Sequence, residues 1–216
     1  MNYKNVILRN QAIPRFVETY IAGVDEAGRG ALAGPVVAAA VILDSKQAIE
    51  GCVDSKKLSP ARRDYLADKI KEVARAWAIG SADSDEIDRI NILNATLLAM
   101  KRAIEGLEPK PQRVLIDGNR CPQSYIPCNA IIAGDDRMLC IAAASILAKT
   151  TRDRQMRMLA DRYPSYHFAE HKGYATRKHR LALTNHGSCA VHRMSWVKVR
   201  EAIAQVSLPL NEKNEL

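Results

Sequence analysis

The sequence lacks the features of a membrane or secreted protein. No run of about 18 apolar residues occurs in its 216 residues, so a membrane-spanning helix is not expected. Aromatic residues make up only 5% of the chain, and no basic helix carries the strong aromatic face of a membrane-surface segment. Residues 1–15 are mixed polar and do not form the apolar core of a secretion signal. We therefore expect a cytoplasmic protein with no membrane partner.

Cysteine is scarce and irregularly spaced. The five cysteines are odd in number and include no C-x-x-C pair, a pattern that predicts neither a zinc knuckle nor a disulfide framework. A reducing compartment fits such a chain best. The cysteines are Cys52, Cys121, Cys128, Cys140 and Cys189.

Acidic residues are outnumbered by basic ones. The chain has 24 Asp and Glu residues against 32 Lys and Arg residues, which gives a formal net charge of +8 and a pI near 9.3. This excess favours a polyanionic partner, because neutralising phosphates releases condensed counterions. Charge alone does not identify that partner.

Internal repeats and low-complexity segments are also missing. A hydrophobic content of 47% is ordinary for a soluble chain that can bury one sizeable core. We expect a monomer in which residues 1–216 form a single domain. Its core should cover about 18–175, a small helical appendage about 176–206, and a mobile tail 207–216.

Hydrophobic periodicity predicts an α/β architecture. The continuous apolar run at 36–43 is typical of a strand buried on both faces, and it should pair with the strand before it. Ser59 and Pro60 predict the start of a helix, and Asp83 with Glu86 resembles a capping box. The expected strands cover 20–24, 36–43, 77–82, 114–116 and 129–133, and the expected helices cover 60–74, 84–107, 138–162 and short segments within 176–204.

One segment near the N-terminus combines acid and base. Asp25 and Glu26 are adjacent carboxylates, and Arg29 follows between Gly28 and Gly30. Successive strand side chains point to opposite faces, so the two carboxylates should share one site only if the strand ends there. The glycines allow backbone N–H groups to approach a ligand, and arginine offers a planar fork for phosphate. The alternative is a charged hairpin turn without function.

Several short motifs follow one another along residues 20–196. They are Gly23 to Leu43, Asp54 to Ser59, Leu115 to Asn119, Gly134 with Asp135, Ala143 to Lys149 with Arg152 and Asp153, and His171 to Tyr174. Each is weakly specific alone, whereas the ordered set is highly specific. In this order of motifs the chain resembles the bacterial ribonuclease HII family, the type 2 ribonucleases H.

Three alanines depart from the family pattern. Ala31 and Ala175 stand where proline is common, and Ala133 stands where a lysine often precedes the Gly-Asp pair. None of them replaces a carboxylate. We therefore expect the departures to affect substrate binding rather than catalysis.

The resemblance implies a fold and a reaction. The fold would be the RNase H-like layered one, with a mixed central sheet flanked by helices and a small C-terminal helical appendage. The reaction would be endonucleolytic hydrolysis of the RNA strand of RNA/DNA hybrids, and cleavage at ribonucleotides embedded in duplex DNA, leaving 3′-hydroxyl and 5′-phosphate ends. Two metal ions would assist it.

Four carboxylates would hold the metal ions and carry catalysis. Clustered like charges raise one another's pKa values and need a hard cation to neutralise them, and oxygen ligands favour Mg²⁺ or Mn²⁺ over zinc. The four are Asp25, Glu26, Asp117 and Asp135. Asp136 is the alternative to its neighbour, which is chosen because it directly follows the glycine of the family motif.

Substrate binding would use the glycine turn, Tyr174 and lysines. By resemblance, the backbone of Gly28, Arg29 and Gly30 would approach the ribose, and Tyr174 would hydrogen-bond its 2′-hydroxyl. Phosphates would be bound by basic side chains of the Asp54 to Ser59 motif and of the late helices. Those assigned here are Lys56, Lys57, Lys149 and Lys172. One predicted helix carries a basic stripe of Lys149, Arg152, Arg154 and Arg157, for which a solvated helix face is the alternative.

Other classes of function stay open at this point. The chain could be a nucleic-acid-binding module without catalysis, or a metal-dependent phosphohydrolase of small molecules. Five histidines lie in late polar segments without the context of a zinc protease or serine hydrolase. Of these, His171 and His192 are candidates for phosphate contacts or for structural roles.

Overall fold

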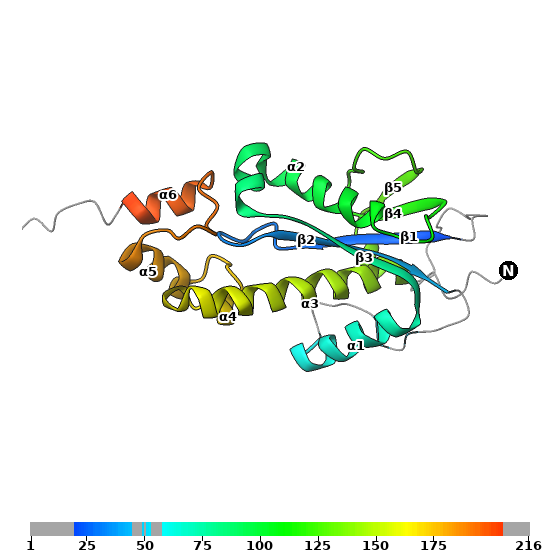
Figure 1. The fold of residues 1–216 in the computed structure, drawn as a ribbon, viewed down its shortest axis with the longest axis horizontal. Coiled ribbons are helices and arrows are strands. Elements are labelled where there is room, and N and C mark those ends of the chain that lie inside the picture. Colours follow the sequence, from blue (N-terminus) through cyan, green and yellow to red (C-terminus); the bar gives the residue numbers. More distant parts are fainter. Residues whose placement is uncertain (1–19, 45–48, 50, 53–57, 205–216) are drawn as a thin grey trace, which may run out of the picture.

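The computed structural model describes residues 20–44, 49, 51–52 and 58–204 (Figure 1). Lys56 and Lys57 lie outside the described residues. So do the N-terminal segment 1–15 and the tail expected from residue 207.

A mixed five-stranded sheet forms the centre of the described chain. Its spatial order is β3-β2-β1-β4-β5; β2 is antiparallel to both β3 and β1, whereas β4 is parallel to both β1 and β5. The strands are β1 (Ile21–Ala27), β2 (Val36–Leu43), β3 (Ala74–Ala82), β4 (Arg113–Asp117) and β5 (Cys128–Ile131). The expected mixed sheet is confirmed.

The helices begin at the residues that the sequence signals. Ser59 accepts a hydrogen bond from the backbone N–H of Arg62 at the start of α1, and Asp83 and Glu86 form a reciprocal capping box before α2. None of the described helices has both the length and the apolar character needed to cross a bilayer. The helices are α1 (Pro60–Val73), α2 (Ser84–Glu105), α3 (Leu139–Arg162), α4 (Phe168–His171), α5 (Arg177–His186) and α6 (Val197–Ala204), with short 3₁₀ turns η2 (Gly134–Asp136) and η3 (Pro164–Tyr166).

Helices cover both faces of the sheet. The side chains of Ala22, Val24 and Ile116 lie in one core cluster with α2, whereas Ala39 and Val41 pack in a second cluster with α1 and α3. Figure 1 shows α2 on one side of the sheet and α3 on the other. Alternate strand residues therefore face different helices, and this alternation determines which side chains can meet α3.

Three predicted strand limits were wrong. β1 continues past Val24 to Ala27, because Glu26 and Ala27 still pair with Ala38 and Val37 of β2. β3 begins at Ala74, which was expected in the preceding helix, since this residue pairs with β2 instead. β5 covers only 128–131 of the chain, where it can pair with β4.

The expected short C-terminal helices are confirmed. They pack against the segment that follows β1. Leu32 and Met156 share a buried cluster with Leu183 of α5 and Val199 of α6. Ala33 also forms an isolated β-bridge with His192. The last described part of the chain is thus joined to the segment that follows β1.

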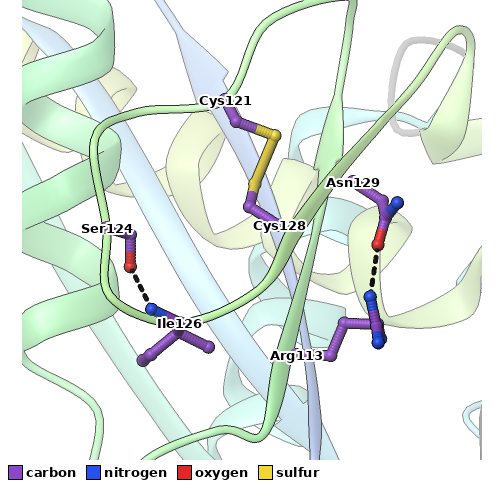
Figure 2. The surroundings of a disulfide bond; sticks show 6 residues. All are labelled: Arg113, Cys121, Ser124, Ile126, Cys128 and Asn129. Carbon is purple, nitrogen blue, oxygen red and sulfur yellow. Dashed lines mark hydrogen bonds between the residues drawn. A yellow bond between two sulfur atoms is a disulfide. The ribbon is translucent and has the colours of Figure 1, made fainter.

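The structure contradicts the expectation that the cysteines are unpaired. Cys121 and Cys128 form a disulfide across the loop between β4 and β5, with 6.2 Å between their Cα atoms (Figure 2). Their spacing matches no short motif. The two cysteines come together because Cys128 of β5 pairs with Val114 of β4, which brings the chain back near Cys121. The other cysteines are free. The disulfide closes the loop that begins shortly after Asp117.

Gly23 sets the distance between β1 and α3. A Cβ atom at this position would lie 2.2 Å from the backbone carbon of Cys140 and 2.3 Å from the backbone nitrogen of Ile141. Backbone atoms at a helix start cannot yield as a side chain can. We predict that Gly23→Ala lowers the free energy of unfolding by at least about 3 kcal/mol in urea titrations.

Gly30→Ala is the matched control. The nearest atom to a Cβ there is Cε1 of Tyr174 at 4.0 Å, so the unfolding free energy should change by less than about 0.5 kcal/mol. Equal stability of the two variants would show that β1 and α3 are not in the tight contact described.

Candidate active site

Two carboxylates meet at the ends of neighbouring parallel strands. β1 and β4 are in a register that pairs Val24 with Ile116, so the next residues, Asp25 and Asp117, lie side by side. Alternation places both on the face covered by α3, where the hydroxyl of Ser145 donates a hydrogen bond to Asp25. The parallel pairing therefore brings together two acids that are 92 residues apart.

Glu26 joins the same site although it lies inside β1. Its side chain is only 12% exposed and accepts a hydrogen bond from Nη1 of Arg29 at 3.2 Å. The strand ends at Ala27, directly before Gly28, so the two acids lie near the strand end, as their sharing of one site requires. The backbone N–H of Glu26 donates to Oδ1 of Asp25 at 2.7 Å.

Burial and neighbouring negative charges disfavour the ionised forms of Asp25 and Glu26. Burial raises the pKa of Asp25 well above its ordinary value, and the charges of Glu26 and Asp117 raise it further, while the Ser145 hydrogen bond opposes them. Burial also raises the pKa of Glu26, although the charge of Arg29 lowers it. The site therefore favours any ligand that brings positive charge.

The fourth predicted acid, Asp135, lies on η2 beside this cluster. Oδ1 of Asp117 accepts a hydrogen bond of 2.7 Å from the N–H of Gly134, which anchors η2 to the end of β4. Asp135 is 7% exposed and is outside the set of residues that line the cleft with the other three acids. Asp136 is less buried. The choice between the two neighbours stays a prediction.

A cleft of about 480 Å³ opens over the acids. Its lining combines the three carboxylates, the glycine turn, cations and one aromatic ring. The residues are Asp25, Glu26, Ala27, Gly28, Arg29, Gly30, Arg63, Asp117, Ser145, Lys149 and Tyr174. The sequence analysis missed Arg63 and Ser145, although Ser145 lies in a matching motif.

The two glycines of the turn have different reasons to be glycine. Gly28 has φ +98°, and a Cβ atom there would lie 1.9 Å from Nε of Arg152. At Gly30 the backbone imposes no such restriction, and a Cβ would point into open space beside Tyr174. Gly28 is required by the fold, whereas Gly30 leaves room for a ligand.

Arg152 is not the surface phosphate contact that its place in a basic helical stripe suggested. It is fully buried, and its Nε donates to the carbonyl of Pro35 at 2.9 Å. Burial lowers its pKa. The stripe fails here because helical spacing cannot distinguish a solvated face of α3 from one covered by the chain after β1.

Tyr174 and Lys149 lie together at the cleft. The Lys149 ammonium lies 5.7 Å from the centre of the Tyr174 ring, and the Arg152 guanidinium lies 5.3 Å from it. Lys149 also donates to Asp153 at 2.7 Å, and Arg63 donates to the same carboxylate at 3.4 Å. Asp153 thus holds two cations at the rim of the site.

Lys172 lies next to this cationic group but does not line the cleft. Its ammonium donates to the carbonyl of Ala169, and Asp153, Lys149 and Arg157 are close enough to affect its charge. Burial lowers its pKa. The structure therefore places Lys172 near Lys149 without a direct position over the acids.

Three of the late histidines, His171, His179 and His192, have structural roles. His179 is fully buried and its Nε2 lies 3.1 Å from Nε2 of His192, while Nε2 of His171 lies 2.8 Å from the carbonyl oxygen of Tyr166. Burial lowers the pKa values of His171 and His192 to about 4. Neutral, internally bonded rings of this kind are poor phosphate contacts, which decides between the two roles left open.

The acidic cluster has the chemistry of a hard-cation site without a complete protein cage. Among the residues that the structure describes, no three His, Cys, Asp or Glu side chains are placed to hold a metal ion by themselves. Mg²⁺ is usually bound by one or two carboxylates, with water and substrate phosphate completing its shell. The all-oxygen donors and the raised pKa of Asp25 fit such an ion.

Known proteins similar to this chain are bacterial ribonucleases HII. A ribonuclease HII of Thiobacillus denitrificans is 55% identical over 188 residues, which is 87% of this chain and 92% of that protein. One of Polynucleobacter necessarius is 54% identical over 192 residues, covering 87% of this chain and 98% of that protein.

A solved structure has the same fold. The crystal structure of ribonuclease H2 from Pyrococcus horikoshii matches with a TM-score of 0.72 and 27% identity, covering 87% of this chain and 98% of that chain. The expected RNase H-like layered fold is thereby confirmed. The ribonuclease HII family model matches residues 22–199. With the high identities to curated relatives, this match shows that the chain belongs to the ribonuclease HII family.

Proposed function

We propose that the enzyme hydrolyses the RNA strand of RNA/DNA hybrids and also cuts duplex DNA at embedded ribonucleotides, leaving 3′-hydroxyl and 5′-phosphate ends. The observation that carries this proposal is the junction of Asp25, Glu26 and Asp117 with the Gly28–Gly30 turn in one cleft. Acids that bind a cation and backbone that can approach a sugar are adjacent there.

Two divalent ions, Mg²⁺ or Mn²⁺, would activate the attacking water and stabilise the leaving 3′ oxygen when bound. Asp25, Glu26, Asp117 and Asp135 would be their ligands. Asp25 and Asp117 present their carboxylates from adjacent strand ends, and η2 is tied to Asp117 through the N–H of Gly134. That hydrogen bond holds the carboxylate of Asp117 in one orientation.

Selectivity for a ribonucleotide would come from the turn and Tyr174. A mixed duplex offers only one chemical mark at the cleaved position, the 2′-hydroxyl, which both donates and accepts hydrogen bonds. Backbone N–H groups near Gly30 and the Tyr174 hydroxyl would meet it. Lys149, Lys172 and Arg63 would contact phosphates, which carry no sequence information.

A small-molecule phosphohydrolase is the weaker candidate. Such an enzyme would use the same acids, but it would leave the cationic rim formed by Arg63, Lys149 and Lys172 without a partner. A hybrid duplex has a phosphate array that matches this rim.

The proposal predicts cleavage of two duplexes out of three. With Mg²⁺ or Mn²⁺, the wild-type protein should cut an RNA/DNA hybrid and a DNA duplex with one ribonucleotide, and it should leave an all-DNA duplex intact. Asp117→Asn should lose at least about 100-fold in rate on both substrates, because an amide keeps the bond to Gly134 but weakens cation coordination.

Asp136→Asn is the control and should be milder. Equal losses at positions 117 and 136 would contradict the choice of acids, and cleavage of the all-DNA duplex would contradict the proposed substrate.

Asp25→Asn should stabilise the metal-free protein at neutral pH. The raised pKa of Asp25 means that the folded state binds its proton more tightly than the unfolded state, so stability falls as pH rises from the ordinary carboxyl pKa of about 4 through the raised value. The variant should gain at least about 1 kcal/mol of unfolding free energy at pH 7, and this gain should vanish below about pH 4.

Urea titrations in EDTA at both pH values measure this difference. Added Mn²⁺ should stabilise the wild type more than the variant. A variant less stable than the wild type at pH 7 would show that burial and neighbouring charges do not disfavour the ionised carboxyl of Asp25.

Gly30→Ala and Tyr174→Phe should impair ribonucleotide recognition without unfolding. The Cβ at Gly30 would occupy the space beside Tyr174, and the phenylalanine would keep the ring near Arg152 while removing the hydroxyl. We expect kcat/KM at a single ribonucleotide to fall about 10-fold or more in each, a loss of about 1.4 kcal/mol in transition-state stabilisation.

The melting temperatures and the affinities for all-DNA duplex serve as controls and should stay close to wild type. Full-rate cleavage by Tyr174→Phe would leave recognition of the 2′-hydroxyl to the glycine turn alone.

A further inference from the structure

Arg193, far from the cleft in sequence, binds the back of the glycine turn. Its Nη2 donates to the carbonyl of Gly28 at 2.7 Å and its Nη1 to the carbonyl of Arg29 at 2.8 Å. Nε and Nη2 also donate to the carbonyl of Gly34, at 3.0 and 2.9 Å. One guanidinium thus fixes three carbonyl groups at the two ends of the segment that leaves β1.

The Arg193 side chain is fully buried. The ion pairs found among the described residues do not include it. Burial, with the nearby charge of Arg152, lowers its pKa to about 9. The planar fork of arginine can satisfy three carbonyls from one side, whereas lysine has a single ammonium point. The contact depends on the shape of the guanidinium and not on its charge alone.

Fixing these carbonyls also fixes the opposite edges of their peptide planes. In a trans peptide, the C=O of one residue and the N–H of the next point in opposite directions. The carbonyls of Gly28 and Arg29 point at Arg193, so the N–H groups of Arg29 and Gly30 point away from it. Gly28, Arg29 and Gly30 line the catalytic cleft, whereas the buried Arg193 is not among its lining residues.

Arg152 supports the same turn from α3. Its guanidinium occupies the space that a Cβ at Gly28 would need and lies near the Tyr174 ring, and its Nη2 donates to the carbonyl of Ala33 at 3.3 Å. The turn and the tyrosine therefore rest on neighbouring arginines. Arg193 is the one supplied by the C-terminal segment, and its backbone N–H also donates to the carbonyl of Leu32 at 2.9 Å.

We infer that Arg193 is a positioning residue for ribonucleotide recognition: by holding the Gly28 and Arg29 carbonyls, it aims the N–H groups of Arg29 and Gly30 at the ribose of the bound strand. This inference rests on the proposed function of the turn. The C-terminal segment, which contributes no acid to the site, thereby takes part in recognising the ribonucleotide.

The test compares Arg193→Lys and Arg193→Gln with wild type. Lysine keeps the positive charge without the fork, and glutamine removes the buried charge. Both should raise KM for a duplex with one ribonucleotide about 10-fold or more, with a smaller change in kcat. The Kd for an all-DNA duplex should stay within about twofold, because phosphate contacts do not use the turn.

Val199→Ala is the matched control for damage to the C-terminal segment. Val199 of α6 is fully buried in the cluster that includes Leu32, and it is not among the residues that line the cleft. This variant should lower the melting temperature while keeping the wild-type KM for the ribonucleotide duplex. The contrast with Arg193→Lys separates positioning of the turn from general stability.

Three results would overturn the inference. They are an unchanged KM in both Arg193 variants, a KM increase in Val199→Ala equal to theirs, and failure of both Arg193 variants to fold when Val199→Ala folds. A wild-type protein with no preference for the ribonucleotide duplex would instead contradict the proposed function, whatever the Arg193 variants do.

Discussion

The parallel pairing of β1 with β4 is the constraint on which the site depends. Val24 opposite Ile116 places Asp25 beside Asp117, and a shift of one residue would turn the Asp117 side chain to the face covered by α2. Gly23 lets the start of α3 approach β1 closely, which brings Ser145 to Asp25. The ionised forms of these buried acids are unfavourable without a counter-charge, as the raised pKa values of Asp25 and Glu26 indicate, and a cationic ligand would stabilise them.

Buried arginines form the second physical theme. Arg152 and Arg193 have their donors directed mainly at backbone carbonyls around the glycine turn. Burying a guanidinium costs least when its N–H groups are hydrogen-bonded, as those named here are, although Nη1 of Arg152 has no partner among the described residues. The carbonyls of an irregular loop need donors in turn. The arginine N–H groups and the loop carbonyls are hydrogen-bonded to each other, so a segment without regular secondary structure acquires a defined shape. That shape presents Gly30 and Tyr174 to the cleft.

Much of the architecture could be predicted from the sequence because local signals and periodicity agree. The capping box at Asp83 and Glu86 and the apolar run of β2 were both found where expected. Strand limits were less predictable: alanine favours helices, yet Ala74 pairs with Leu43 of β2 and therefore begins a strand. The Cys121–Cys128 disulfide was missed for a similar reason, since only the return of β5 along β4 brings the cysteines together.

Residue identity and motif order alone identified the family, and they predict the four acids and the glycine turn as its site. Tertiary structure decided which of these residues act together. It placed Asp25, Glu26 and Asp117 on one cleft and Asp135 beside it, and it moved Arg152 from a presumed surface stripe into the interior. Arg193 had no sequence signal at all. Its part depends on contacts across more than 150 residues, and such contacts exist only once the chain has folded.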